Sequence, residues 1–110
     1  MPVRPEPLRG EVWDVWFHRI GEHPAVIISV NAVNRRLGHV VAIPVTGNPG
    51  PPLTHVTLTR ETALTRYAES YANITDIQSV SRDRCRRRRG LLATSELRTI
   101  ETQLRVYLAL

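Results

Sequence analysis

The sequence has no lysine, a single cysteine and only short apolar runs. The one cysteine, Cys85, cannot form an internal disulfide and provides no metal-binding cluster, so we expect a protein of the reducing cytoplasm. A membrane-spanning helix needs ~20 consecutive apolar residues. The apolar runs here are far shorter, so we expect no membrane partner. The N-terminal segment, MPVRPEPLRG, also lacks the apolar core of a signal peptide.

Length and composition indicate one globular domain. The chain has 110 residues, of which 42% are hydrophobic, and this is enough for a single modest core but not for two. The prolines of the N-terminal segment predict a loose arm over residues 1–9. We therefore expect a single domain over residues 10–110.

Charge is distributed unevenly along the chain, and all 15 basic side chains are arginines. Residues 1–81 carry seven arginines and seven acidic residues, whereas residues 82–110 carry eight arginines and three acidic residues. The last part of the chain therefore holds the entire net charge of +5. Clustered arginine predicts a polyanionic partner such as nucleic acid. A GC-rich genome would explain the missing lysine, but it would not explain this clustering.

Alternating or continuous apolar stretches, separated by turn residues, predict an antiparallel sheet. The expected strands cover residues 10–17, 25–30, 39–46, 54–59, 70–77 and 87–93. Residues 18–24 are expected to form a short connection and residues 31–38 a brief helical turn. Pro44 lacks an N–H and should lie at an edge or bulge near the end of its strand. Trp13 and Phe17 share one face of the first strand and Trp16 lies on the other. These three aromatic residues could stack on bases, but the strand periodicity favours the core or a dimer interface.

A C-terminal helix is predicted to begin at Thr94, a favourable N-cap residue, with Glu96 adding negative charge to its first turn. Apolar residues then recur at helical spacing, and these residues are Leu97, Ile100, Leu104, Tyr107 and Leu108. Glu101 and Arg105 have the spacing of an ion pair on the outer side of the helix. The expected fold class is mainly β with a C-terminal helix, arranged as a small SH3-like barrel of antiparallel strands.

Four segments, in the order in which they occur along the chain, resemble segments of the MazF/PemK/Kid-type toxins. The segments LRGEVWDVWF, HPAVIIS and VVAIPVTGN look like the opening strands of that family. The segment GLLATSELRTIETQLRVYLAL is similar to its closing strand and helix. The likeness covers nearly the whole chain after Arg9, and it is carried by the ordered set of segments with this spacing, since no single motif is diagnostic.

The resemblance implies a homodimeric toxin of a type II toxin–antitoxin pair, with a barrel like those of MazF and CcdB. Such toxins cut single-stranded RNA at short sequences, without a metal or any other cofactor. In the usual reaction the ribose 2′-hydroxyl attacks the adjacent phosphate and leaves a 2′,3′-cyclic phosphate and a 5′-hydroxyl. The cognate antitoxin lays an extended acidic tail across the RNA groove at the dimer interface.

The candidate catalytic residues include departures from the family pattern. The family places Arg-Pro where this chain has His23-Pro24, and a basic residue where this chain has Thr75. Histidine changes charge near neutral pH, so His23 is either the proton-transfer group or a polar residue at the mouth of a strand. Arg19, four residues upstream, is the nearest candidate for charge stabilisation. Thr46 matches the family's threonine, which implies a phosphate ligand, although threonine is also common where strands end.

The candidate RNA-binding residues are amides and arginines. Asn48 and Asn73 match amide positions of the family and could contact RNA bases, although asparagine is also a normal turn residue. The run RDRCRRRRG supplies Arg86, Arg87, Arg88 and Arg89, which either bind RNA and the acidic antitoxin tail or form an ordinary solvated segment. The same arginines favour a lowered pKa for Cys85, to which we assign no role. His18, His39 and His55 lack the spacing of metal ligands, so no metal site is expected.

Two other functions stay open. Gyrase-poisoning toxins share the fold without cutting RNA, but they carry a Trp-Gly-Ile-type C-terminal end, whereas this chain ends in LRVYLAL. A relative that lost cleavage together with its two cationic positions would keep only the antitoxin-binding groove.

Overall fold

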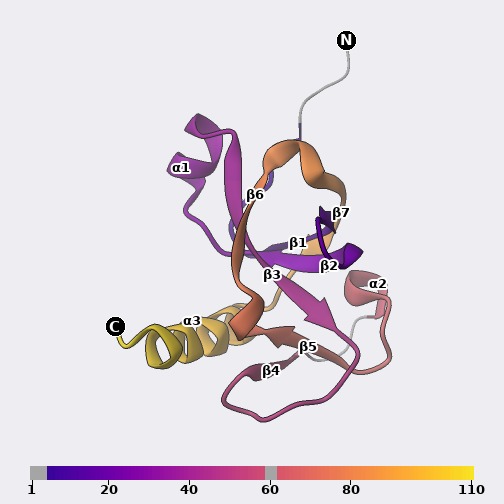
Figure 1. Ribbon diagram of the computed structural model, residues 1–110, viewed down its shortest axis with the longest axis vertical. Helices are drawn as coiled ribbons and strands as arrows, with labels where there is room; N and C mark the ends of the chain where they lie inside the picture. The colour runs from indigo at the N-terminus through magenta and orange to yellow at the C-terminus, as the bar shows by residue number, and fades with distance from the viewer. Residues whose placement is uncertain (1–4, 59–61) are drawn as a thin grey trace.

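The computed structural model describes residues 5–58 and 62–110, and Figure 1 shows how their strands and helices are arranged. The strands are β1 (Glu11–Phe17), β2 (Gly21–Ile27), β3 (His39–Thr46), β4 (His55–Leu58), β5 (Ser70–Asn73), β6 (Gln78–Ser81) and β7 (Cys85–Leu91). The helices are α1 (Asn31–Arg36), α2 (Thr62–Thr65) and α3 (Thr94–Leu108), with short 3₁₀ turns η1 (Ile74–Asp76) and η2 (Arg82–Arg84). No helix in these ranges is long and apolar enough to span a membrane.

The strands form one antiparallel, barrel-like sheet with a C-terminal helix, which confirms the expected fold class. The order of strands is β4-β5-β3-β2-β1-β7, and β6 pairs with β3 outside this path. In the described part of the chain no ladder joins β4 to β7, so the sheet is open. Helix α3 contacts β4 and η1, whereas α2 contacts β1, β2 and β7.

Strand β3 changes partner along its length. Its first half pairs with β6 and the ladder ends at Ala42, whereas its second half pairs with β5 from Val45 onward. Pro44 lies between these two ladders, opposite Ala25 of β2. The prediction that Pro44 lies at an irregularity near the end of its strand is confirmed. At the break between the two ladders no strand needs a hydrogen bond from residue 44, so the lack of an N–H on proline is tolerated.

The core consists of two apolar clusters, one on each face of β1 and β2. Val15 and Phe17 belong to the cluster that is formed by side chains of β1, β2, β3, β6 and β7, and Trp13 packs against it. The expectation that this face of β1 lies in the core is confirmed. Val12 belongs to the other cluster, which Ile100 and Leu104 of α3 cover. Strand β1 is thus buried on both faces. Its acidic residues Glu11 and Asp14 are buried too.

Helix α3 differs from its prediction at both ends. The N-cap is Ala93 and not Thr94, and the Glu96 carboxylate accepts a hydrogen bond of 3.3 Å from the Ala93 N–H. Tyr107 and Leu108 were expected on the packed face, but they are about half exposed because the helix extends beyond the sheet. Glu101 forms its ion pair with Arg9 of the N-terminal segment.

Several element boundaries also differ from the prediction. Strand β2 begins at Gly21, so the connection before it is residues 18–20 and not 18–24. The strand expected over 70–77 ends at Asn73, and β6 and α2 were not predicted. Residues 1–4 of the expected arm, and Thr59 of the fourth strand, lie outside the described residues, whereas Pro7 is buried.

Candidate functional site

His23 lies within β2, two residues after the hairpin that joins β1 to β2. It pairs with Val15 of β1. On its other side, β2 pairs with β3 in a register that matches Ala25 with Pro44 and Val26 with Ile43. The ladder ends at the Ala25–Pro44 pair, and the same alignment extended by two residues toward the hairpin would set His23 against Thr46. Residues opposite each other in an antiparallel pair present their side chains on the same face.

Both ring nitrogens of His23 have a neighbour. Nε2 lies 3.1 Å from the carbonyl oxygen of Ile20, in the hairpin turn. Nδ1 lies 3.3 Å from the hydroxyl of Tyr67, which is 44 residues away in the sequence. The side chain is half-buried, so the ring is held in place and still reaches solvent.

Thr46 ends β3 and begins a tight turn. Its Oγ1 accepts a hydrogen bond of 3.1 Å from the N–H of Asn48. The next residue, Gly47, lies directly under the ring of Tyr67, because a Cβ added to this glycine would stand 3.0 Å from Cδ1 of that ring. Tyr67 therefore contacts the segment that carries Thr46 and also contacts His23.

Arg66 brings a positive charge to the same place. Its Nη2 donates a hydrogen bond of 2.6 Å to the carbonyl oxygen of Glu22, next to His23. Its guanidinium carbon lies 5.8 Å from the centroid of the Tyr67 ring. Neither Arg66 nor Tyr67 was predicted from the sequence. The only local signal was an Arg-Tyr pair in a stretch assigned to no element, and the contact to β2 is a long-range one.

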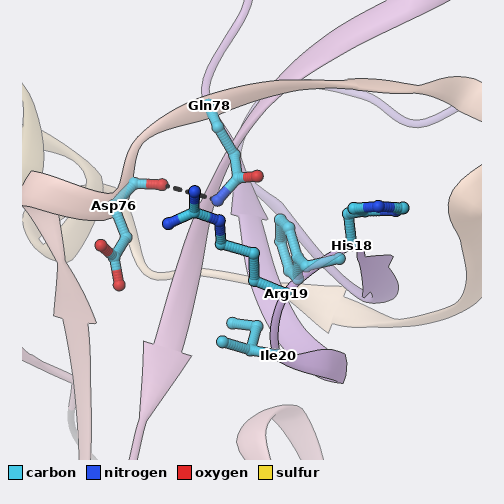
Figure 2. A pocket seen from close by; sticks show the side chains of 6 residues that line it. His18, Arg19, Ile20, Asp76 and Gln78 are labelled. Atoms are coloured by element: carbon cyan, nitrogen blue, oxygen red, sulfur yellow. Dashed lines mark hydrogen bonds between the residues drawn. The ribbon is translucent and has the colours of Figure 1, made fainter.

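Arg19 faces a different side of the hairpin. It lines a cavity of about 250 Å³ together with Phe17, His18, Ile20, Asp76 and Gln78. Figure 2 shows its guanidinium group between Asp76 and Gln78, and the Gln78 amide donates a hydrogen bond to the backbone carbonyl of Asp76. The structure thus places Arg19 on the same turn as the Ile20 carbonyl that contacts His23, but its side chain extends into this cavity.

The two candidate amides have different surroundings. Asn48 is exposed at the turn after Thr46. Asn73 ends β5, and its amide is engaged locally: Nδ2 donates to Oδ2 of Asp76 at 3.0 Å, and Oδ1 accepts from the Thr75 hydroxyl at 2.9 Å. Thr75, at the position where the family has a basic residue, therefore helps to hold this amide in the turn.

The arginine run forms β7, and three of its four candidate residues are paired with carboxylates of β1. Arg88 pairs with Glu11, whereas Arg87 and Arg89 approach Asp14 at 3.4 Å and 2.6 Å. Burial alone would raise the pKa of Glu11. Hydrogen bonds from the Arg88 and Trp13 side chains and the Leu8 N–H, together with the charge of Arg88, outweigh burial and lower that pKa. Within the described residues Arg86 has no such ion pair.

Two further arginines near the run have structural contacts. Arg82 is buried, and its Nη1 donates to the carbonyl oxygens of Asn34 and Arg35 at the end of α1. Arg84 stacks over the Trp16 ring at 4.6 Å from its centroid. The net charge of this part of the chain is therefore not all available at the surface.

Cys85 differs from its prediction. The thiol is buried, and desolvation raises its pKa to about 12, against the opposing effect of the Arg82 charge. The expectation of a lowered pKa was wrong because burial outweighs the neighbouring arginines. Residues 5–58 and 62–110 also contain no group of three His, Cys, Asp or Glu side chains placed to hold a metal ion.

Comparison with known proteins agrees with this fold. The chain is similar to an "endoribonuclease in complex with its cognate antitoxin from Mycobacterial species", with 30% identity, a TM-score of 0.83, and coverage of 94% of this chain and 96% of the other. It is also similar to an "endoribonuclease from Mycobacterial species", with 28% identity, a TM-score of 0.81, and coverage of 99% and 97%. The MazE-MazF structure from Deinococcus radiodurans shares the fold, at 23% identity, a TM-score of 0.80, and coverage of 96% and 98%.

A search of curated proteins finds no match. Residues 8–108 match the family described as "PemK-like, MazF-like toxin of type II toxin-antitoxin system". This match spans nearly the whole chain, including every residue of the His23 and Thr46 site. The chain belongs to the PemK-like, MazF-like family of type II toxin–antitoxin toxins.

Proposed function

We propose that this toxin is an endoribonuclease that cuts single-stranded RNA without a metal ion. The observation that supports the proposal is the β2–β3 ladder, which ends at the Ala25–Pro44 pair and whose alignment, extended by two residues, would set His23 against Thr46. A titratable ring and a hydroxyl group on one face are the elements needed to bind a phosphodiester and to move a proton beside it. The endoribonucleases similar to this chain support the same reaction class.

The proposed reaction is an internal transfer at phosphorus. A base removes the proton of the ribose 2′-hydroxyl, and the 2′-oxygen forms a bond to the adjacent phosphorus. The bond from phosphorus to the 5′-oxygen of the next nucleotide breaks, and that oxygen takes up a proton from an acid. The products are a 2′,3′-cyclic phosphate and a 5′-hydroxyl, and no water is consumed.

His23 is assigned the proton transfer because histidine can accept and donate protons near neutral pH. Thr46 is assigned the binding of the scissile phosphate through its hydroxyl, with the backbone turn to Asn48 holding that hydroxyl in place. Arg19 is assigned the stabilisation of negative charge in the reaction, from the side of the hairpin that faces the cavity. These assignments follow the family resemblance as well as the register.

The RNA strand would extend from this site along the turn after β3, the end of β5 and strand β7. Asn48 and Asn73 are assigned contacts with bases, with Asn73 having to exchange its local hydrogen bonds to do so. Arg86 to Arg89 on β7 are proposed to attract the phosphates of the RNA backbone electrostatically. We further propose a homodimer, and a cognate antitoxin whose extended acidic tail competes for the same groove.

The test is incubation of a long RNA with the purified protein in EDTA, followed by mapping of cut sites and of end chemistry. We expect cleavage with 5′-hydroxyl ends, which His23→Ala and Thr46→Ala abolish. His39→Ala and Thr99→Ala are matched controls, because His39 is exposed at the far end of β3 and Thr99 is exposed on α3.

Two outcomes would count against the proposal. Intact RNA at high concentrations of a folded protein would exclude the activity. Cleavage by His23→Ala at the wild-type rate would remove His23 from the mechanism.

A further inference from the structure

Arg66 and Tyr67 follow α2 and contact β2 from a distant part of the sequence. We infer that these two residues complete the catalytic site, with Tyr67 positioning the His23 ring and Arg66 supplying the charge beside the scissile phosphate. The inference rests on the proposed RNA cleavage and extends it, because no motif or resemblance assigns either residue a role.

The hydrogen-bonding of His23 shows what Tyr67 does. The Ile20 carbonyl next to Nε2 can only accept a hydrogen bond, so in the neutral ring Nε2 carries the hydrogen. Nδ1 is then the acceptor, and the Tyr67 hydroxyl donates to it. The two contacts select one tautomer and fix the rotation of the ring. Nδ1 is left as the basic nitrogen, and in the proposed reaction the ribose 2′-hydroxyl would take the place of the Tyr67 hydroxyl beside it and pass its proton to it.

Tyr67 also has a fixed position of its own. Its ring lies against Gly47, where even a methyl group would stand 3.0 Å from Cδ1. Because Gly47 directly follows Thr46, the tyrosine sets the spacing between the His23 ring and the turn that carries the Thr46 hydroxyl. A glycine at this position permits the close approach.

Arg66 brings a positive charge to the neighbourhood of His23. The neutral His23 ring has no charge of its own with which to stabilise a phosphate. The Arg66 guanidinium donates to the Glu22 carbonyl, next to His23, and lies 5.8 Å from the centroid of the Tyr67 ring. Arg66 is exposed, so a phosphate bound beside His23 can approach its guanidinium group from solvent.

The backbone of Arg66 is also unusual. It has a φ of 59°, in the left-handed region that is unfavourable for residues with a side chain. It occupies the position directly after α2, where helices commonly end on a left-handed glycine. An arginine here accepts strain that glycine would avoid, and strained residues of this kind concentrate at functional sites.

The first experiment compares Tyr67→Phe with Tyr107→Phe, a matched control that is half-exposed at the end of α3. We expect Tyr67→Phe to lower kcat by about 10–100-fold, with little change in KM. Loss of the donor to Nδ1 should also move the acid limb of the pH–rate profile to higher pH. Arg66, whose guanidinium contacts the backbone next to His23, is unchanged in this variant. Wild-type kcat and an unmoved profile in Tyr67→Phe would overturn the role of Tyr67.

A second measurement does not depend on cleavage. The nitrogen chemical shifts of the His23 ring, measured by two-dimensional NMR, report which nitrogen carries the hydrogen. We expect the Nε2–H tautomer in the wild type and a mixture of tautomers in Tyr67→Phe. The same tautomer populations in both proteins would overturn the positioning role. If the wild type leaves RNA intact, the proposed function fails, and this measurement still decides the role of Tyr67.

The third experiment compares Arg66→Gln and Arg66→Lys with Arg98→Gln, an exposed control on α3. Removal of one charged donor from a transition state typically costs about 100-fold in kcat. We expect Arg66→Gln to lose about that factor and Arg66→Lys to recover part of it, while Arg98→Gln keeps the wild-type rate. Equal rates for Arg66→Gln and wild type, in a preparation that cuts RNA, would overturn the role of Arg66.

Discussion

The ion pairs around Asp14 predict that two neighbouring arginines of β7 contribute very differently to stability. Arg89 donates to Oδ1 of Asp14 at 2.6 Å, and only 10% of its side chain is exposed. Arg87 approaches Oδ2 at 3.4 Å, and 68% of its side chain is exposed. The Asp14 side chain is 6% exposed, so both arginines share one buried carboxylate.

The expected magnitudes follow from this difference in exposure. Removing one partner of a buried ion pair costs about 3–5 kcal/mol, because the remaining charge is left buried. Arg87 remains beside Asp14 in Arg89→Gln and offsets part of this cost, so we expect a loss of about 2–3 kcal/mol. An exposed ion pair is worth at most about 1 kcal/mol, so Arg87→Gln should cost less than that.

The assay is urea denaturation followed by tryptophan fluorescence, with thermal unfolding as a second measurement. Trp13 and Trp16 lie on β1 on either side of Asp14, so their emission reports on this strand. The loss expected for Arg89→Gln corresponds to a decrease in Tm of about 10–20 °C for a domain of about 100 residues. Equal losses in the two variants, or a loss below about 1 kcal/mol in Arg89→Gln, would refute the reasoning from burial.

Two further predictions concern titratable groups. The pKa of Glu11 is lower in the folded state than its ordinary value of 4.5, so its contribution to stability is present above that value and is lost as the pH falls through the folded pKa. The decrease in Tm between about pH 5 and about pH 3 should therefore be steeper in the wild type than in Glu11→Gln, and parallel curves would contradict the ion pair with Arg88. The Cys85 thiol, with a pKa raised to about 12, should resist a thiol reagent at neutral pH in the folded protein and react on addition of denaturant. Rapid labelling of the native protein would show that it is not buried.

The strands with apolar side chains could be predicted from the sequence, and those stabilised by polar contacts could not. The apolar runs in β2 and β3 predicted buried strands, and every residue from Ala25 to Ile28 does lie in the core. Strand β6 escaped prediction because only Val80 in it is buried. Strand β7 was predicted over residues 87–93 but begins at Cys85. The pairing of Arg87, Arg88 and Arg89 with carboxylates on β1 was not predicted, because no local pattern reveals a contact between strands.

The glycine at position 21 is a sequence signal for the start of β2. In the structure Gly21 has a φ of 77°, and a glycine with positive φ is common where a short hairpin loop meets the next strand. Reading the loop as residues 18–20 would have placed His23 inside β2, and the register with β3 would then have followed from the pairing of Ala25 with Pro44.

The candidate site could be predicted only in part, for a similar reason. His23 and Thr46 came from the resemblance, because their positions in the ordered strands match the family. Arg66 and Tyr67 reach the site through contacts 44 residues apart, after a helix of four residues that is too short to show a periodic pattern. Such contacts depend on the folded path of the chain and not on neighbouring residues.

The pairing of β7 with β1 has a consequence for how salt affects RNA affinity. A protein that neutralises phosphates releases condensed counterions in proportion to the number of cations engaged, and this number sets the slope of affinity against salt concentration. Arg87, Arg88 and Arg89 already neutralise Asp14 and Glu11. An RNA strand on β7 would exchange places with those carboxylates and would release fewer ions than four free arginines do. Its affinity should therefore weaken with salt more gradually than the sequence charge suggests.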